Sequence, residues 1–189
     1  MSHTASQAQL HVRAQSGAIW PCYNHFMKTS QKVHEDAKSL LEETHIVELL
    51  NAFGKVHIVG SYAANLMWNP DIDIVVITDA PQESAIRAMG ELARKELFQK
   101  LEFGDFKNYP KRNRPESFIV NARKEWKGEE WEIETWFVTD IGDRLEVVEK
   151  LKNLSESDRQ KIIDRKMQRS LSGNTKHDLS SWEIYRDFI

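Results

Sequence analysis

Two short motifs in the middle of the 189-residue sequence have the residue types and the spacing to bind a metal ion and a phosphate group. Asp71 and Asp73 lie two positions apart in the segment DIDIVVIT, whose β-branched and apolar residues are typical of a strand. On a strand both carboxylates project from one face, while Ile72 points to the other. Two carboxylates this close repel each other, and hard oxygen ligands of this kind favour Mg²⁺ or Mn²⁺.

The pair Gly60-Ser61 lies upstream of the aspartates, where a short apolar segment ends. Glycine lets the backbone come close to a ligand. The Ser61 hydroxyl and the free N–H groups at the start of the following segment can hold a phosphate. We therefore expect a phosphate site beside the carboxylate pair.

A third acid is expected on a later strand, Trp131–Val138, with the sequence WEIETWFV. Glu132, Glu134 and Trp136 alternate onto one face of this strand. Two glutamates in an otherwise apolar stretch are costly unless they are solvated or bound to a cation. If the strand lies beside 71–78, one of the two glutamates joins the metal site. Solvent exposure alone also explains Glu132.

The spacing G-S-x9-D-x-D, followed by an acid on a later strand, resembles the DNA polymerase beta superfamily of nucleotidyltransferases. The surrounding residues, VGSYAANLMWNPDIDIVV, look closest to small bacterial nucleotidyltransferase-domain proteins. The resemblance covers residues 55 to 138. It implies a mixed sheet with flanking helices, two Mg²⁺ ions, and transfer of a nucleoside monophosphate from an NTP to an acceptor hydroxyl with release of pyrophosphate.

The resemblance also implies roles for particular residues. It assigns metal ligation and catalysis to Asp71, Asp73 and Glu134, and nucleotide binding to Gly60 and Ser61. Two departures stand beside this match. Many relatives carry a glycine four residues after the serine, often preceded by arginine, where this chain has Asn65 and Ala64. The third acid is Glu134, where aspartate is more usual in the family.

Composition limits the class of protein. The chain has a formal net charge of −3 and a single cysteine, Cys22, so a generic polyanion binder, an internal disulfide and a multi-cysteine zinc site are all excluded. No apolar run approaches the roughly 18 residues of a membrane span, and the first residues form no apolar signal core. We expect a cytoplasmic protein without a membrane partner.

One segment is locally basic. Residues 107–127 contain seven lysines and arginines against two glutamates. This segment is consistent with binding of a triphosphate, RNA or a phosphorylated acceptor, and equally with a solvated loop and hairpin. Trp126, Trp131 and Trp136 are consistent with a base-stacking surface, although packing in the core or at its edge is the better explanation.

The predicted fold class is α/β (α+β): a small mixed β-sheet flanked by helices, with extra terminal helices. Periodicity and breakers predict helices at 29–53, 81–101, 145–154, 157–171 and 180–189, a helical turn at 62–67, and strands at 55–59, 71–78, 118–122 and 131–138. The predicted organisation is a single domain made of an N-terminal extension 1–28, a nucleotidyltransferase core 29–145 and a C-terminal helical extension 146–189. The aromatic spacing in the last segment predicts one apolar face that docks onto the body.

The sequence therefore predicts a metal-dependent nucleotidyltransferase that takes an NTP. The acceptor stays open among a small molecule, a protein side chain and an RNA end. The alternative is a module without turnover that binds a nucleotide or a protein partner, such as an antitoxin-like nucleotidyltransferase. The absent arginine favours this alternative, and the three acids favour catalysis.

Overall fold

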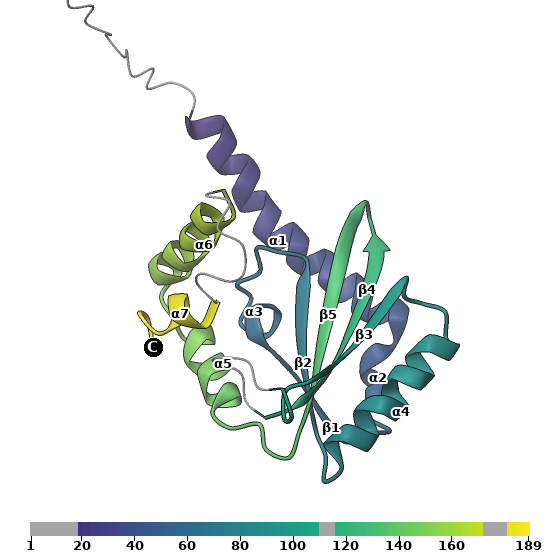
Figure 1. Cartoon of the computed structure of the whole chain (residues 1–189). Helices are drawn as coiled ribbons and strands as arrows, with labels where there is room; N and C mark the ends of the chain where they lie inside the picture. The colour runs from purple at the N-terminus through teal and green to yellow at the C-terminus, as the bar shows by residue number, and fades with distance from the viewer. Residues whose placement is uncertain (1–18, 110–115, 172–180) are drawn as a thin grey trace, which may run out of the picture.

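The computed structural model describes residues 19–109, 116–171 and 181–189 (Figure 1). Its elements, in chain order, are α1 (Ile19–Thr44), α2 (Ile46–Leu50), β1 (Lys55–Val59), α3 (Gly60–Ala63), β2 (Asp71–Ile77), α4 (Pro81–Arg94), β3 (Lys100–Asp105), β4 (Phe118–Trp126), β5 (Glu129–Val138), α5 (Arg144–Lys152), α6 (Glu156–Leu171) and α7 (Ser181–Tyr185). None of the helices in the described ranges combines the length and the apolar character that a membrane crossing requires.

The strands form one mixed sheet in the order β1-β2-β5-β4-β3. β2 and β5 run parallel, and the other neighbouring pairs are antiparallel. Helices flank this sheet, so the predicted fold class is confirmed. The parallel pair lies in the middle of the sheet and carries the predicted acids on both of its strands.

The two faces of the sheet differ in what covers them. One face carries the main core, in which Ile72, Ile74 and Val76 of β2 are fully buried against α1, α2 and α4. On the other face Val59 and Val75 pack against Val148 of α5. Helices α5, α6 and α7 gather beside α3 and β2 (Figure 1). Because successive side chains of β2 point to opposite faces of the sheet, its aspartates lie on the face that α5 covers only in part.

Several predicted elements are confirmed. β1 has the predicted bounds, β2 begins at Asp71 as predicted, and α5, α6 and α7 begin within a residue of prediction. β4 and β5 are longer than predicted and meet at a tight turn. Lys127 and Gly128 in that turn both have positive φ, 51° and 86°, which is the backbone signature of a two-residue hairpin connection.

Other predictions were wrong. The helix expected at 29–53 begins earlier, at Ile19, and it breaks at His45, whose φ of 49° is left-handed. The helix expected at 81–101 ends at Arg94, Glu96 turns left-handed with φ 53°, and the chain enters β3, which was missed. The turn expected at 62–67 is α3, which begins directly at Gly60.

Candidate active site

The two aspartates of β2 share one face of the sheet at the start of the strand. Asp73 is in register with Val59 of β1 on one side and with Glu134 of β5 on the other. Asp71 is in register with Glu132. Since neighbouring strands lie about 4.8 Å apart, the register places a glutamate beside each aspartate on the same face.

Gly60 packs directly against the Asp73 carboxylate. Its φ is +64°, a left-handed backbone that favours glycine, and a Cβ built on it would lie 2.1 Å from Asp73 Oδ2. No side chain fits at that distance. The glycine is therefore required twice, once by the backbone conformation and once by the carboxylate beside it.

Ser61 follows in the only turn of α3 and is 5% exposed. The loop after it closes through a hydrogen bond from Leu66 N to Ser61 O of 2.8 Å, and Asn65 adopts a left-handed φ of 55°. Asparagine tolerates this conformation better than other residues with a side chain. Asn65 can therefore adopt the backbone conformation at a position where many members of the polymerase-beta superfamily have glycine.

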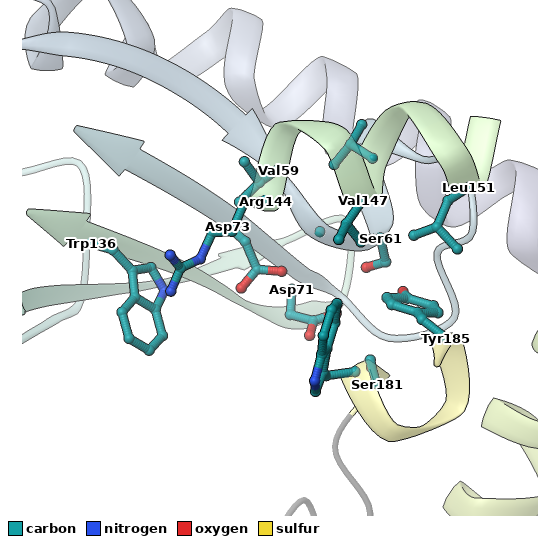
Figure 2. Close-up of a pocket in the computed structure, with 13 residues that line it drawn as sticks. Val59, Ser61, Asp71, Asp73, Trp136, Arg144, Val147, Leu151, Ser181 and Tyr185 are labelled. Atoms are coloured by element: carbon teal, nitrogen blue, oxygen red, sulfur yellow. The ribbon is translucent and has the colours of Figure 1, made fainter. Parts of the chain in front are cut away.

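A cavity of about 200 Å³ joins these residues to the C-terminal helices (Figure 2). Its wall contains Gly60, Ser61, Asp71 and Asp73, so four of the five predicted site residues meet in one cavity. The rest of the wall comes from β1, β5, α5 and α7: Val59, Trp136, Arg144, Val147, Val148, Leu151, Ser181, Trp182 and Tyr185.

Among the described residues that line the cavity, Arg144 is the one cation. Its guanidinium lies over the indole of Trp136, 5.7 Å from the ring centroid, and donates a hydrogen bond to Ile141 O. In Figure 2 the Arg144 side chain lies between Trp136 and Asp73. The cavity therefore combines two carboxylates, a hydroxyl and a guanidinium.

The two candidate glutamates have different surroundings. Glu132 forms an ion pair with Arg123 at 3.3 Å, and Arg123 also pairs with Glu102 and Glu130. Glu134 accepts a 3.1 Å hydrogen bond from Trp136 Nε1, and Trp136 lines the cavity. Glu132 thus has a structural cation partner on β4, and Glu134 is the glutamate adjacent to Asp73.

Glu134 itself does not line the cavity. Within the described residues no three histidine, cysteine, aspartate or glutamate side chains are arranged as a set of metal ligands. The structure therefore brings Asp71 and Asp73 together with Gly60 and Ser61. Glu134 is adjacent to Asp73 in backbone register, but its carboxylate is bonded to the Trp136 indole and does not complete a three-acid set with the aspartates.

The turn beside Ser61 also contacts α1. The ring of Tyr62 stacks on His34, with centroids 4.6 Å apart and an interplanar angle of 13°. Burial lowers the pKa of His34 and raises the pKa of Tyr62. Both rings are therefore kept neutral at pH 7, which suits a stacked apolar contact.

The described residues of the basic segment 107–127 do not line this cavity. Residues 110–115, with Lys111, Arg112 and Arg114, lie outside the described part. Arg123 pairs with the three glutamates named above, Lys124 donates to Leu97 O, and Lys127 pairs with Asp36 at 2.7 Å. Of the three tryptophans considered for base stacking, Trp136 lines the cavity and Trp131 is buried in the core.

Sequence analysis missed the cavity residues of the C-terminal region. Arg144, Trp182 and Tyr185 belong to helices that no motif covers. The spacing of Trp182, Tyr185 and Ile189 predicted one apolar face that docks onto the body. Tyr185 is buried, at 5% exposed, whereas Trp182 and Ile189 are 43% and 38% exposed, so the prediction holds for one of the three residues. The spacing predicted that α7 packs against the body, but it did not predict that α7 lines the cavity with Asp71 and Asp73.

Comparison of the structure with solved structures finds RNA terminal uridylyl transferases. One match is a cytoplasmic RNA terminal U-transferase, with a TM-score of 0.57 and 16% identity, over 86% of this chain and 49% of that one. Cid1 in complex with its short product ApU matches with a TM-score of 0.61 and 16% identity, over 91% of this chain and 53% of that one. Cid1 in complex with the UTP analogue UMPNPP matches with a TM-score of 0.60 and 15% identity, over 88% of this chain and 51% of that one.

These matches define the fold. The chain has the polymerase-beta-like nucleotidyltransferase fold, as its motifs predicted. It spans about half the length of the solved structures it matches. Neither a comparison with protein-family models nor one with curated protein sequences finds a match.

Proposed function

We propose that this chain is a divalent-metal-dependent nucleotidyltransferase, which moves a nucleoside monophosphate from an NTP to an acceptor hydroxyl and releases pyrophosphate. One observation carries the proposal: Asp71 and Asp73 line the same cavity as Gly60 and Ser61. The fold is shared with transferases that were solved with a dinucleotide product and with a UTP analogue, which supports a nucleotide substrate.

The donor set fits hard divalent cations. Asp71 and Asp73 offer carboxylate oxygens from one strand face and line the cavity. Glu134 is the proposed third acid because its backbone lies in register with Asp73, although its carboxylate accepts a hydrogen bond from Trp136 and lies outside the cavity wall. Mg²⁺ is the proposed ion, in two copies, with Mn²⁺ as the alternative. When bound, these ions supply charge neutralisation for the triphosphate and activation of the acceptor hydroxyl.

The cavity offers different surfaces to the two ends of an NTP. Ser61 and Arg144 provide a hydroxyl and a guanidinium for phosphate oxygens. Trp182 of α7 lines the same cavity and is 43% exposed, so its indole is available for stacking on a base. This arrangement supports a nucleotide that lies between the phosphate motif and the C-terminal helices.

The reaction forms one bond and breaks one. The acceptor oxygen bonds to the α-phosphorus, the bond from that phosphorus to the bridging oxygen breaks, and pyrophosphate leaves while the hydroxyl proton passes to solvent. Catalysis of this kind consists mainly of positioning and charge stabilisation. The acceptor remains a small molecule, a protein or RNA, and small bacterial nucleotidyltransferase-domain proteins remain the proposed nearest relatives.

The test is pyrophosphate release from ATP, CTP, GTP and UTP with Mg²⁺ or Mn²⁺, with an RNA oligonucleotide and a cell extract as sources of acceptor. We expect Asp73→Asn to reduce turnover at least about hundredfold, the scale of a lost transition-state charge contact. Its melting temperature should stay the same or rise, because repulsion with Asp71 is relieved. Asp79→Asn, at an exposed position after β2, is the matched control and should keep wild-type activity.

A second candidate function is binding without turnover. It is favoured by the hydrogen bond that engages Glu134 with Trp136, and by Ala64 at the position where relatives carry arginine. Under this alternative the wild type binds nucleotide or a protein partner, as an antitoxin-like relative would, and releases no pyrophosphate with any of the four NTPs. Turnover that Asp73→Asn abolishes would eliminate this alternative.

A further inference from the structure

The guanidinium of Arg144 is held in place at the cavity wall before any ligand arrives. It donates a 3.1 Å hydrogen bond to Ile141 O, and it lies 5.7 Å from the centroid of the Trp136 indole. Both Arg144 and Trp136 line the cavity. An arginine side chain is flexible, so a guanidinium that is already fixed loses less conformational entropy when it binds an anion.

The indole that supports this guanidinium is itself held by two residues. Glu134 accepts a 3.1 Å hydrogen bond from Trp136 Nε1, and the ring centroid of Phe106 lies 6.2 Å from that of Trp136 at an interplanar angle of 54°. The hydrogen bond selects one orientation of the indole, because Nε1 is the only donor of that side chain. Glu134, Trp136 and Arg144 thus form a continuous chain of contacts from β5 to α5.

The loop after Ser61 provides no cation. Residues 62–70 contain no lysine or arginine, and Ala64 lies where many members of the polymerase-beta superfamily carry arginine. Ala64 is fully buried and belongs to the same packed cluster as Leu66 and Leu151. A long side chain at this position would displace its neighbours. A cation for phosphate must therefore come from another element, and among the described residues that line the cavity Arg144 is the one available.

We propose that Trp136 is a positioning residue, which holds the Arg144 guanidinium on the cavity wall so that Arg144 binds phosphate in place of the arginine that is missing beside Ser61. The inference rests on the proposed function and deepens it. A guanidinium has five donors in one plane, of which Ile141 O receives one, and its fork matches the oxygens of a phosphate group. In Figure 2 the Arg144 side chain lies between Trp136 and Asp73, which brings it to the proposed reaction site.

The test measures the binding of UTP and of inorganic tripolyphosphate, each with Mg²⁺, by calorimetry. We expect Arg144→Gln to weaken the binding of both probes at least about tenfold, the scale of a lost hydrogen bond to a charged group. Trp136→Leu should weaken both about three- to tenfold, because the guanidinium is no longer held. Trp136→Phe keeps an aromatic face and should restore most of the affinity.

Trp126→Leu is the matched control. Trp126 also lies against a cation, with Lys127 Nζ 5.8 Å from its ring centroid, but neither residue lines the cavity. We expect this variant to bind both probes with wild-type affinity. The melting temperature of each variant shows that the proteins compared are folded.

A positioning role also predicts that the two main substitutions are not additive. In an Arg144→Gln background, Trp136→Leu should cause little further loss of affinity. A tryptophan that contacts the ligand itself, or one that only stabilises the fold, would weaken binding by the same factor in both backgrounds.

Two substitutions of Glu134 test the far end of the chain of contacts. Glu134→Gln and Glu134→Leu both remove the charge, but only glutamine keeps an oxygen that accepts from the indole N–H. We expect Glu134→Gln to bind both probes more tightly than Glu134→Leu. Equal affinities of these two variants would overturn the positioning of Trp136 by Glu134.

Three results would overturn the inference and leave the proposed function intact. These are additive losses in the double variant, wild-type affinity of Trp136→Leu, and weaker binding of UTP to Arg144→Gln with unchanged binding of tripolyphosphate. If Trp136→Leu does not fold, Arg144→Lys takes its place, because lysine keeps the charge and lacks the planar group that stacks on the indole. Wild-type affinity of Arg144→Lys would then overturn the inference.

The outcomes for the proposed function are distinct from these. A wild type that binds none of the four NTPs would overturn the proposed function and the inference together. A wild type that binds an NTP and releases no pyrophosphate would overturn only the catalytic proposal, since the phosphate contact of Arg144 requires binding and not turnover.

Discussion

Replacement of Gly60 by alanine tests the contact on which the geometry of the aspartates depends. At φ +64° an alanine pays for a left-handed backbone, about 1–2 kcal/mol. Its Cβ would also lie 2.1 Å from Asp73 Oδ2 and 3.1 Å from Asp73 Cβ, so the carboxylate must rotate away. Forced displacement in a packed site costs about 1–3 kcal/mol more, which gives a total loss of about 2–5 kcal/mol in the free energy of unfolding.

Gly142 separates the two contributions. Its φ is +62°, close to that of Gly60, and a Cβ built on it meets nothing within 4 Å. Gly142→Ala should therefore lower the free energy of unfolding only by the contribution of the left-handed backbone, about 1–2 kcal/mol. The difference between the two variants in urea unfolding measures the clash with Asp73. In an Asp73→Ala background that difference should shrink, because the carboxylate is gone and only the 3.1 Å approach to the Cβ of residue 73 remains.

The same variants report on function. Gly60→Ala should abolish nucleotide transfer because it moves Asp73, and Gly142→Ala should retain most of it. Equal destabilisation by the two glycine variants, or a Gly60→Ala protein with wild-type turnover, would refute the claim that Gly60 sets the position of the carboxylate.

Two further predictions concern the third acid and pH. Glu134→Gln should reduce turnover at least about tenfold while nucleotide affinity changes little. Glu132→Gln should keep turnover and lower the free energy of unfolding by at most about 1 kcal/mol, because it loses its ion pair to Arg123. The reversed pattern would make Glu132 the third acid. Burial lowers the pKa of His34, so the folded state binds fewer protons than the unfolded state, and stability is full above the unfolded pKa of about 6.5 and declines below it. Urea unfolding at pH 7.5 and 5.5 should show a smaller acid loss for His34→Gln than for wild type, and an identical loss would contradict the assignment.

The elements that could be predicted from the sequence are those whose structure depends on neighbouring residues in the chain. The strands at 55–59 and 71–78 carry dense β-branched runs, and the two-position spacing of Asp71 and Asp73 survives any error in strand ends. The glycine and the serine lie where a strand gives way to a turn. These features depend on neighbours in sequence, so they could be predicted without knowledge of the fold.

The wrong predictions have a common physical origin. His45 and Glu96 turn the chain left-handed without glycine, so nothing in the sequence marks where their helices end. β3 was lost as a result, because the expected helix ran through its first residues. Tertiary packing supports these conformations, and packing is not visible in a window of local sequence.

The choice between Glu132 and Glu134 needed the register of β5 against β2. Alternation gives both glutamates the same face, and only the pairing with Asp73 and the salt bridge to Arg123 distinguish them. The family resemblance preferred Glu134 by its place in the strand. The cavity residues of α7 needed the fold as well, because they line the same cavity as Ser61 although more than half of the chain separates the two segments.

The parallel pairing of β2 with β5 also has a consequence for folding. The β4-β5 hairpin closes through a two-residue turn, whereas β2 meets β5 only after the intervening helix and strands have been brought together. Closing such a long loop costs entropy before any contact repays it. We expect the hairpin to form early and the seam between the acidic strands to form late. The face that carries Asp71 and Asp73 is then the last part of the sheet to become complete during folding.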